Sequence, residues 1–264
     1  MKNPIRWVVV ILVLAGVAAL VYYRWYSQAP QPQPQPPVHT ETQPAPETKS
    51  EPKIKHPIAE SGEAKPLPAL SESDAAMKEA LAGLFGQKAF AECFYLNDII
   101  RRIVATVDNL PREKVAQRVM PVKPVAGKFL VTGKEDNSVL NPANYSRYAP
   151  YVRLAEAVNV KKLVALYVHF YALYQQAYKD LGYPTGYFND RLVEVIDHLL
   201  AAPDVQGPVK LIQPSVMYQF ADPELEALSA GQKIMVRMGS ENAARIKAKL
   251  KEIRRELTGQ GLKQ

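Results

Sequence analysis

Residues 186–200 read Gly-Tyr-Phe-Asn-Asp-Arg-Leu-Val-Glu-Val-Ile-Asp-His-Leu-Leu, and this stretch decides the fold class. At about 100° per residue, its aliphatic residues fill one arc of a helical wheel without a gap. Its charged residues occupy the opposite arc. This pattern is typical of an α-helix with one face in a core, and it predicts a helix over about residues 187–202, ended before Pro203.

Similar patterns on either side predict an all-α, multi-helix globular domain with minor β content. Ser71 or Ser73 serves as the N-cap of a helix that runs to Phe85 and is ended by Gly86. Further helices are predicted at about residues 91–107, 145–157, 161–181, 223–238 and 240–257. A short β-hairpin is predicted at residues 128–132 and 138–140, and residues 208–220 read as an extended apolar connection. The domain is expected at residues 70–258, followed by a tail at residues 259–264.

Residues 7–26 predict a single transmembrane helix before this domain. Trp7 to Tyr23 is a run of 17 residues without a charged side chain, and at 1.5 Å per residue it spans about 26 Å. A cleaved signal peptide is the alternative, with Ser27-Gln28-Ala29 as the cleavage site. Pro30 directly after that site, and the aromatic cluster before it, favour an uncleaved anchor.

The charges beside this segment predict its orientation. Lys2 and Arg6 lie in a short tail at residues 1–6, whereas only Arg24 precedes Lys49 on the other side. Short flanks rich in Lys and Arg stay in the cytoplasm. We therefore expect a single-pass protein with a cytoplasmic N-terminus and its bulk across the membrane.

Residues 27–69 are predicted to form a disordered, proline-rich tether. Eleven prolines lie between residues 28 and 68. Proline fixes φ and donates no backbone hydrogen bond, and the segment has too few large apolar residues to form a core. A ligand for a proline-recognition module is the alternative. Because such modules are mostly cytoplasmic, a spacer is favoured.

The charge distribution, the cysteine content and the missing motifs argue against several kinds of site. Of the formal charge of +7, most comes from residues 233–264, which hold nine Lys/Arg and three Asp/Glu. This distribution argues against a nucleic-acid-binding face across the whole domain. The single Cys93 excludes an intramolecular disulfide. The sequence contains no phosphate-binding glycine loop, nucleophile motif or zinc-ligand set, so we expect no cofactor and no metal.

The first candidate surface is the polar face of the helix at residues 187–202. Its carboxylates and histidine share one face, as an acid–base or metal site would require. The members of this group are Asp190, Arg191, Glu194, Asp197 and His198. A solvated or salt-bridged face is the simpler interpretation, because the apolar arc is complete on the other side. A partner surface and a catalytic site are the alternatives.

Two further surfaces are candidates for binding. Four tyrosines at helical spacing are either core residues or a groove for a peptide or glycan: Tyr167, Tyr171, Tyr174 and Tyr178. The last predicted helix carries a basic face that includes Arg245, Lys249, Arg254 and Arg255. That face is either solvated or in contact with anionic lipid or an acidic partner.

Four segments carry a family resemblance. They are Thr106-Val-Asp-Asn-Leu-Pro111, Arg147-Tyr-Ala-Pro-Tyr151, residues 186–200 and residues 218–232. Together they resemble a bacterial domain-of-unknown-function family, number 3014, over about residues 70–255. The resemblance implies a single-pass protein of the bacterial cytoplasmic membrane with its domain in the periplasm. It implies no activity and no catalytic residues.

Two functions of different classes follow from these observations. The favoured hypothesis is a non-enzymatic periplasmic interaction or scaffold module that binds an envelope protein or glycan. The alternative is a cell-envelope enzyme that acts on peptidoglycan or glycan through the acidic residues 190–198.

Overall fold

The computed structural model describes residues 54–58, 66–134 and 137–259. The chain divides into two compact units, Met1–Lys49 and Ser50–Gln264, and the described residues belong to the second. The anchor predicted at residues 7–26 and most of the tether predicted at residues 27–69 lie outside the described residues. Within the described ranges, no helix is both long and apolar enough to span a bilayer.

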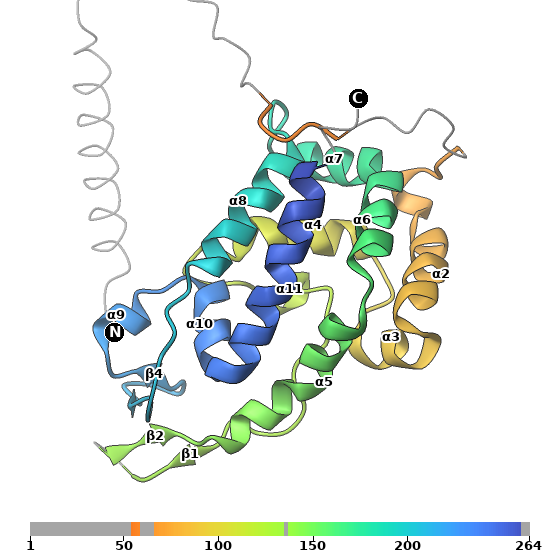
Figure 1. The fold of residues 1–264 in the computed structure, drawn as a ribbon. Helices are drawn as coiled ribbons and strands as arrows, with labels where there is room; N and C mark the ends of the chain where they lie inside the picture. Colours follow the sequence, from red (N-terminus) through yellow and green to blue (C-terminus); the bar gives the residue numbers. More distant parts are fainter. Residues whose placement is uncertain (1–53, 59–65, 135–136, 260–264) are drawn as a thin grey trace, which may run out of the picture. The chain divides into compact units, whose positions relative to one another are not determined.

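The described part is mostly helical, as the sequence predicts (Figure 1). Its α-helices are α2 (Asp74–Phe85), α3 (Gln87–Cys93), α4 (Ile99–Asn109), α5 (Ala143–Ala157), α6 (Val160–His169), α7 (Tyr171–Asp180), α8 (Phe188–Leu200), α9 (Pro223–Glu226), α10 (Ala230–Arg237) and α11 (Ser240–Gly259). Two short 3-10 helices, η1 (Leu70–Glu72) and η2 (Gln117–Val119), precede α2 and follow α4. The prediction of a multi-helix domain with minor β content is confirmed. The prediction of a single helix over residues 223–238 is wrong, because this segment divides into α9 and α10, and the Ser229 side chain caps the start of α10.

Two small antiparallel hairpins supply the β content. The first lies within the predicted hairpin, whereas the second lies in the segment expected to be an extended connection. An isolated bridge between Val139 and Lys210 joins the two hairpins. The strands are β1 (Val131–Thr132) paired with β2 (Val139–Leu140), and β3 (Leu211–Ile212) paired with β4 (Gln219–Phe220).

The prediction of a single helix over residues 91–107 is wrong, because the helix is interrupted between α3 and α4. Asp98, before α4, has a left-handed backbone conformation with φ of 52°. The Asp74 carboxylate accepts hydrogen bonds from the backbone N–H groups of Asp98 (2.8 Å) and Ile99 (3.0 Å). A side chain of α2 therefore satisfies the free N–H groups at the start of α4. Because this cap comes from a distant residue, the local sequence does not reveal the break.

The helix predicted over residues 161–181 also divides, at Phe170 between α6 and α7. The Phe170 N–H donates to the Leu166 carbonyl oxygen (3.1 Å), and the Phe170 carbonyl accepts from the Tyr174 N–H (3.3 Å). The same residue thus ends one helix and begins the next. Its side chain is 3% exposed and belongs to the core cluster that contains Met77. Burial of this ring accounts for the change of direction.

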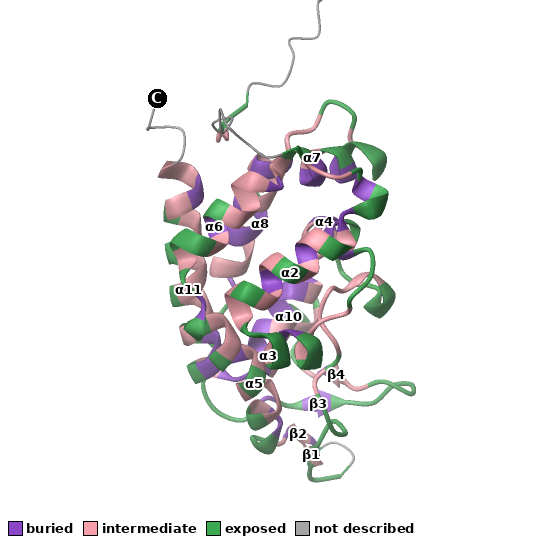
Figure 2. Ribbon diagram, turned by 90° about the vertical axis from the view of Figure 1, so that its right-hand side faces the viewer, coloured by how far each residue is buried: buried purple, intermediate pink, exposed green. Residues whose placement is uncertain are grey.

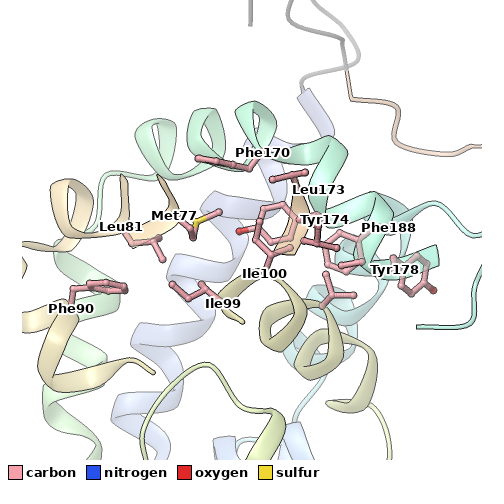
Figure 3. Close-up of a cluster of buried hydrophobic side chains, with 13 residues drawn as sticks. Met77, Leu81, Phe90, Ile99, Ile100, Phe170, Leu173, Tyr174, Tyr178 and Phe188 are labelled. Atoms are coloured by element: carbon pink, nitrogen blue, oxygen red, sulfur yellow. The ribbon is translucent and has the colours of Figure 1, made fainter. Parts of the chain in front are cut away.

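The largest core cluster lies between α2, α4, α7 and the start of α8 (Figure 3). Met77 and Phe188 are completely buried. The Tyr174 ring stacks on Phe188 with ring centroids 5.9 Å apart and an interplanar angle of 3°. Burying each side chain of this size contributes about 1.5–3 kcal/mol. This cluster fixes the position of the first turn of α8, where the candidate acidic residues begin.

Helix α11 closes the other side of the domain by packing against α5, α6, α8 and α10. Figure 2 shows buried residues on its inner side and exposed residues on its outer side. Leu257, which is 1% exposed, joins a second core cluster with Val164, Val193 and Ile196. The apolar residues of this helix therefore face the core.

Candidate functional site

Asp190, the first acidic candidate of α8, binds residues 54–58, here called the strap. Its carboxylate accepts hydrogen bonds from the backbone N–H groups of Lys55 (2.9 Å) and His56 (2.7 Å). Asp190 lies in the first turn of α8, where the helix dipole also favours a negative charge. These contacts hold the carboxylate in one orientation and make it an attachment point.

Two neighbours of Asp190 extend the attachment. The Asn189 side-chain amide donates to the His56 carbonyl oxygen (2.8 Å), and the Tyr187 hydroxyl accepts from the Ile58 N–H (2.8 Å). All four bonds therefore involve backbone atoms of the strap. Leu67, also assigned to the tether from the sequence, packs against the main core cluster. Contacts with the domain thus begin before residue 70.

Arg191 and Glu194 belong to a network of ion pairs that ends at a buried carboxylate. Arg191 lies 2.9 Å from Glu194 and 3.3 Å from a carboxylate oxygen of Asp108 in α4. The Asp108 side chain is only 3% exposed, and it also accepts from Arg112 (2.6 Å) and from the Tyr183 hydroxyl (3.1 Å). This network connects the end of α4 to α8. Sequence reasoning missed Asp108, because nothing in its own segment indicates burial.

Asp197 and His198 contact two further elements. The Asp197 carboxylate pairs with Arg254 of α11, with one contact of 2.9 Å. His198 Nε2 lies 2.8 Å from the Ser229 hydroxyl, which caps the start of α10. Four of the five candidates of α8 therefore bind the strap, α4, α11 or the cap of α10, and Glu194 pairs with Arg191 within α8, so the five do not converge on one point. In the described part of the chain, no group of three or more His, Cys, Asp or Glu residues is arranged to hold a metal.

The four candidate tyrosines belong to the core and its edge. Tyr174 and Tyr178 are buried, and the Tyr167 ring lies 5.6 Å from Tyr171 and 5.2 Å from Tyr174, between ring centroids. Burial raises the pKa of the Tyr167 and Tyr174 hydroxyls. The Tyr167 hydroxyl donates to the side-chain oxygen of Asn189 (3.2 Å). The tyrosines thus pack α6 and α7 against α8 and orient one residue that binds the strap.

The basic candidates of α11 mostly have partners on the domain itself. Arg245 forms a two-bond ion pair with Glu156 of α5, and this hydrogen bonding lowers the pKa of the Glu156 carboxyl. Lys249 Nζ lies 3.2 Å from the carboxylate of Glu252, also in α11. Arg254 is bound to α8 as described above, and Arg255 is exposed. Two of the four basic candidates, Arg245 and Arg254, therefore fasten α11 to its neighbours.

A cavity that no sequence pattern indicated lies between α5, α6, α10, α11 and residues 117–125. Its volume is about 520 Å³, within the range of about 300–1,000 Å³ that is usual for small-molecule sites. Its walls are mainly aromatic and aliphatic. They include Phe85, Phe94, Met120, Leu154, Ile234 and Ile253. Because these residues are spread from α2 to α11, each looks like an ordinary core residue in its own segment.

Few polar groups line this apolar cavity. They are the side chains of Gln117, Lys123, Tyr148, Tyr151 and Lys249. The Tyr151 hydroxyl donates to the Lys123 carbonyl oxygen (2.9 Å). Burial raises the pKa of both tyrosines, so they are neutral at neutral pH. No Asp or Glu is among the described residues that line the cavity. Lys249 is paired with Glu252, whereas Lys123 forms no ion pair with a described residue, so Lys123 supplies the uncompensated positive charge.

A second, more polar cavity of about 370 Å³ lies between α4 and α7, beside η2. Two of its three arginines, Arg101 and Arg102, are already engaged within the domain. Arg101 pairs with Asp180 (3.1 Å), and Arg102 donates to the Asn97 carbonyl oxygen (2.9 Å). The apolar cavity is therefore the better candidate for a ligand.

Comparison with protein families shows to which family the chain belongs. Residues 99–254 match the family described as Protein of unknown function (DUF3014). The chain belongs to this family. The family resemblance of the sequence is thereby confirmed. Comparisons with curated proteins and with solved structures found no significant match.

The DUF3014 match extends from α4 through most of α11. It includes the helices that form most of the apolar cavity, together with Asp108 and Asp190. The strap, α2 and α3 lie before the matched residues. Phe85 and Phe94, which complete one wall of the cavity, therefore come from outside the DUF3014 match.

Proposed function

We propose that this protein is a membrane-anchored, non-enzymatic binding module that holds an apolar ligand in the cavity between α5, α6, α10 and α11. The predicted helix at residues 7–26 supplies the anchor. The charge asymmetry of Lys2 and Arg6 against Arg24 supports a cytoplasmic N-terminus and a periplasmic domain. In this role the module carries or senses its ligand at the surface of the cytoplasmic membrane.

The apolar cavity is the observation that carries this proposal. Moving one CH₂ group from water to an apolar site gains about 0.8 kcal/mol. An alkyl chain of about ten carbons therefore gains roughly 8 kcal/mol before the cost of immobilisation, which limits the affinity to the micromolar range or weaker. A cavity of about 520 Å³ is suited to a ligand of this size.

The charge of the lining selects the kind of head group. Lys123 and Lys249 are the charged residues of the lining, and Lys123 carries the charge that no described carboxylate compensates. An ammonium group close to an apolar cavity repels a cationic ligand and attracts an anionic one. We therefore expect a neutral or anionic amphiphile to bind better than a cationic one of equal length.

The contacts of α8 favour this module over an envelope enzyme. Asp190 binds the strap, Glu194 pairs with Arg191, and Asp197 pairs with Arg254. A general acid or base must reach a substrate proton directly or through one water. Carboxylates that are bound to separate structural partners do not form a pair of general acid and general base facing one substrate.

Displacement of a polarity-sensitive apolar dye from the full chain tests the proposal. Dodecanoate should displace the dye at a lower concentration than dodecyltrimethylammonium, which has the same chain length and the opposite charge. Leu154→Trp places a larger side chain in the cavity and should weaken dodecanoate binding about tenfold or more. The matched control is Ala172→Trp, at an exposed position of α7.

Binding of dodecanoate that is equal in the Leu154→Trp variant and the wild type would refute the cavity as the site. The predicted anchor is identical in all three proteins, so amphiphile bound to that segment does not distinguish them. The difference between the two tryptophan variants therefore isolates the cavity.

A further inference from the structure

The loop between β3 and β4 displays the most exposed large apolar side chains of the described residues. Val216 is 87% exposed and Met217 is 73% exposed. Figure 2 shows this loop as an exposed extension beyond the strands. Neither side chain is needed for the core, because the cluster beneath the hairpin is formed by Leu211 and Phe220 with residues of other elements.

Further exposed apolar residues surround the base of this loop. Phe129 and Leu130 precede β1, and Ile212 ends β3; each is between 38% and 43% exposed. The Phe129 ring contacts Tyr218, the residue after Met217, with ring centroids 5.9 Å apart. Two segments distant in sequence thus contribute to one apolar surface. Extended exposed apolar surfaces of this kind mark contacts with proteins or membranes.

Positive charges accompany this apolar surface. Lys128 directly precedes Phe129, and Lys210 lies two residues before Ile212. Neither lysine forms an ion pair with a described residue. The acidic residues that follow β4 are partly engaged: Asp222 caps α9 and Glu226 pairs with Lys233, while Glu224 remains exposed.

We propose that the loop between β3 and β4 is a membrane-contact element that inserts Val216 and Met217 into an anionic lipid surface. Apolar side chains enter the boundary between head groups and acyl chains, while lysines beside them stay with the anionic head groups. Lys128 and Lys210, which lie within two residues of exposed apolar residues in the sequence, favour an anionic bilayer over an uncharged apolar partner. The contact is independent of the ligand cavity, whose residues lie on other elements.

Quenching by brominated lipids tests this contact in the full chain. In a Cys93→Ser background, Met217→Cys carries a polarity-sensitive fluorophore. The matched control carries the same fluorophore at Gln176→Cys, an exposed position of α7. Vesicles contain acyl-brominated phosphatidylcholine, with or without phosphatidylglycerol. The fluorophore at position 217 should be quenched in the anionic vesicles, and the one at position 176 should not.

Substitutions at the same surface supply the expected magnitudes. Lys128→Gln and Lys210→Gln should each lower the ratio of docked to undocked probe about fivefold, because each lysine near an anionic surface contributes about 1 kcal/mol. Val216→Ser should lower this ratio about tenfold, because an apolar side chain no longer leaves water. All three positions are exposed, so the fold is retained.

Three outcomes would overturn the proposal. The first is an unquenched probe at position 217 in anionic vesicles, and the second is equal quenching at positions 217 and 176. The third is shielding of position 217 only in native membranes that retain their proteins, which would make the partner a protein. Failure of this contact leaves the dodecanoate result unaffected, so the two proposals are tested separately.

Discussion

Replacing Asp108 should destabilise the domain more than any other single change to its ion pairs. The Asp108 carboxylate is 3% exposed and binds Arg112, Arg191 and the Tyr183 hydroxyl. Removing one partner of a buried pair costs about 3–5 kcal/mol. Because Arg112 is 54% exposed and can return to water, we expect about 3 kcal/mol for Asp108→Ala. Asp108→Asn keeps one acceptor and should cost about half as much.

Urea unfolding of a fragment with residues 50–264, the second compact unit, measures this effect. Asp180→Ala is the matched control, because it breaks an ion pair with Arg101 whose partners are 40% and 48% exposed. Such exposed pairs contribute about 0–1 kcal/mol. If Asp108→Ala and Asp180→Ala changed the free energy of unfolding equally, the argument from burial would be wrong.

Three more outcomes are expected. Asp190→Ala should speed hydrogen exchange at the Lys55 and His56 amides. It should change the free energy of unfolding by less than about 1 kcal/mol, because the conformational entropy lost on ordering the strap offsets most of the gain from its hydrogen bonds. Unchanged exchange at these amides would contradict the attachment. Burial and then Glu92 raise the pKa of the Cys93 thiol, so Glu92→Gln should lower that pKa and speed alkylation at pH 7, whereas slower alkylation would contradict this cause. An alkaline phosphatase fused after Gln264 should be active, and an inactive fusion together with a fluorescent cytoplasmic reporter would refute the predicted orientation.

The sequence predicted the extents of α2 and α8. Helix α2 begins just after Ser73 and ends before Gly86, although the Ser73 hydroxyl donates to the Leu70 carbonyl oxygen and does not cap the helix. Helix α8 lies within its predicted range. One missed break, between α9 and α10, has a local cap at Ser229. The other two involve distant residues: a carboxylate of α2 caps α4, and the break between α6 and α7 coincides with burial of the Phe170 ring in the core. Periodicity contains no information about such contacts. The hairpin of β3 and β4 was missed because residues 213–218 between its strands contain no glycine or asparagine to indicate a turn, unlike residues 133–138 of the predicted hairpin.

The candidate sites were less accessible to sequence reasoning than the helices. The polar face of α8 was found, and salt bridging was among its interpretations, but its partners could not be known before α4, α11 and the strap were placed. The apolar cavity gave no signal, because Leu154, Ile234 and Ile253 have the spacing of ordinary core residues. A cavity results from what neighbouring side chains fail to fill, which a helical wheel does not show.

The strap is held in a way that leaves its composition free to change. Asp190, Asn189 and Tyr187 all bind main-chain groups of residues 54–58. Substitution of Lys55 or His56 by most other residues preserves every donor and acceptor that these three residues use. Proline is the exception, since it lacks the amide hydrogen. Substitutions in the strap can therefore alter its charge and solubility while its point of attachment to the domain stays the same.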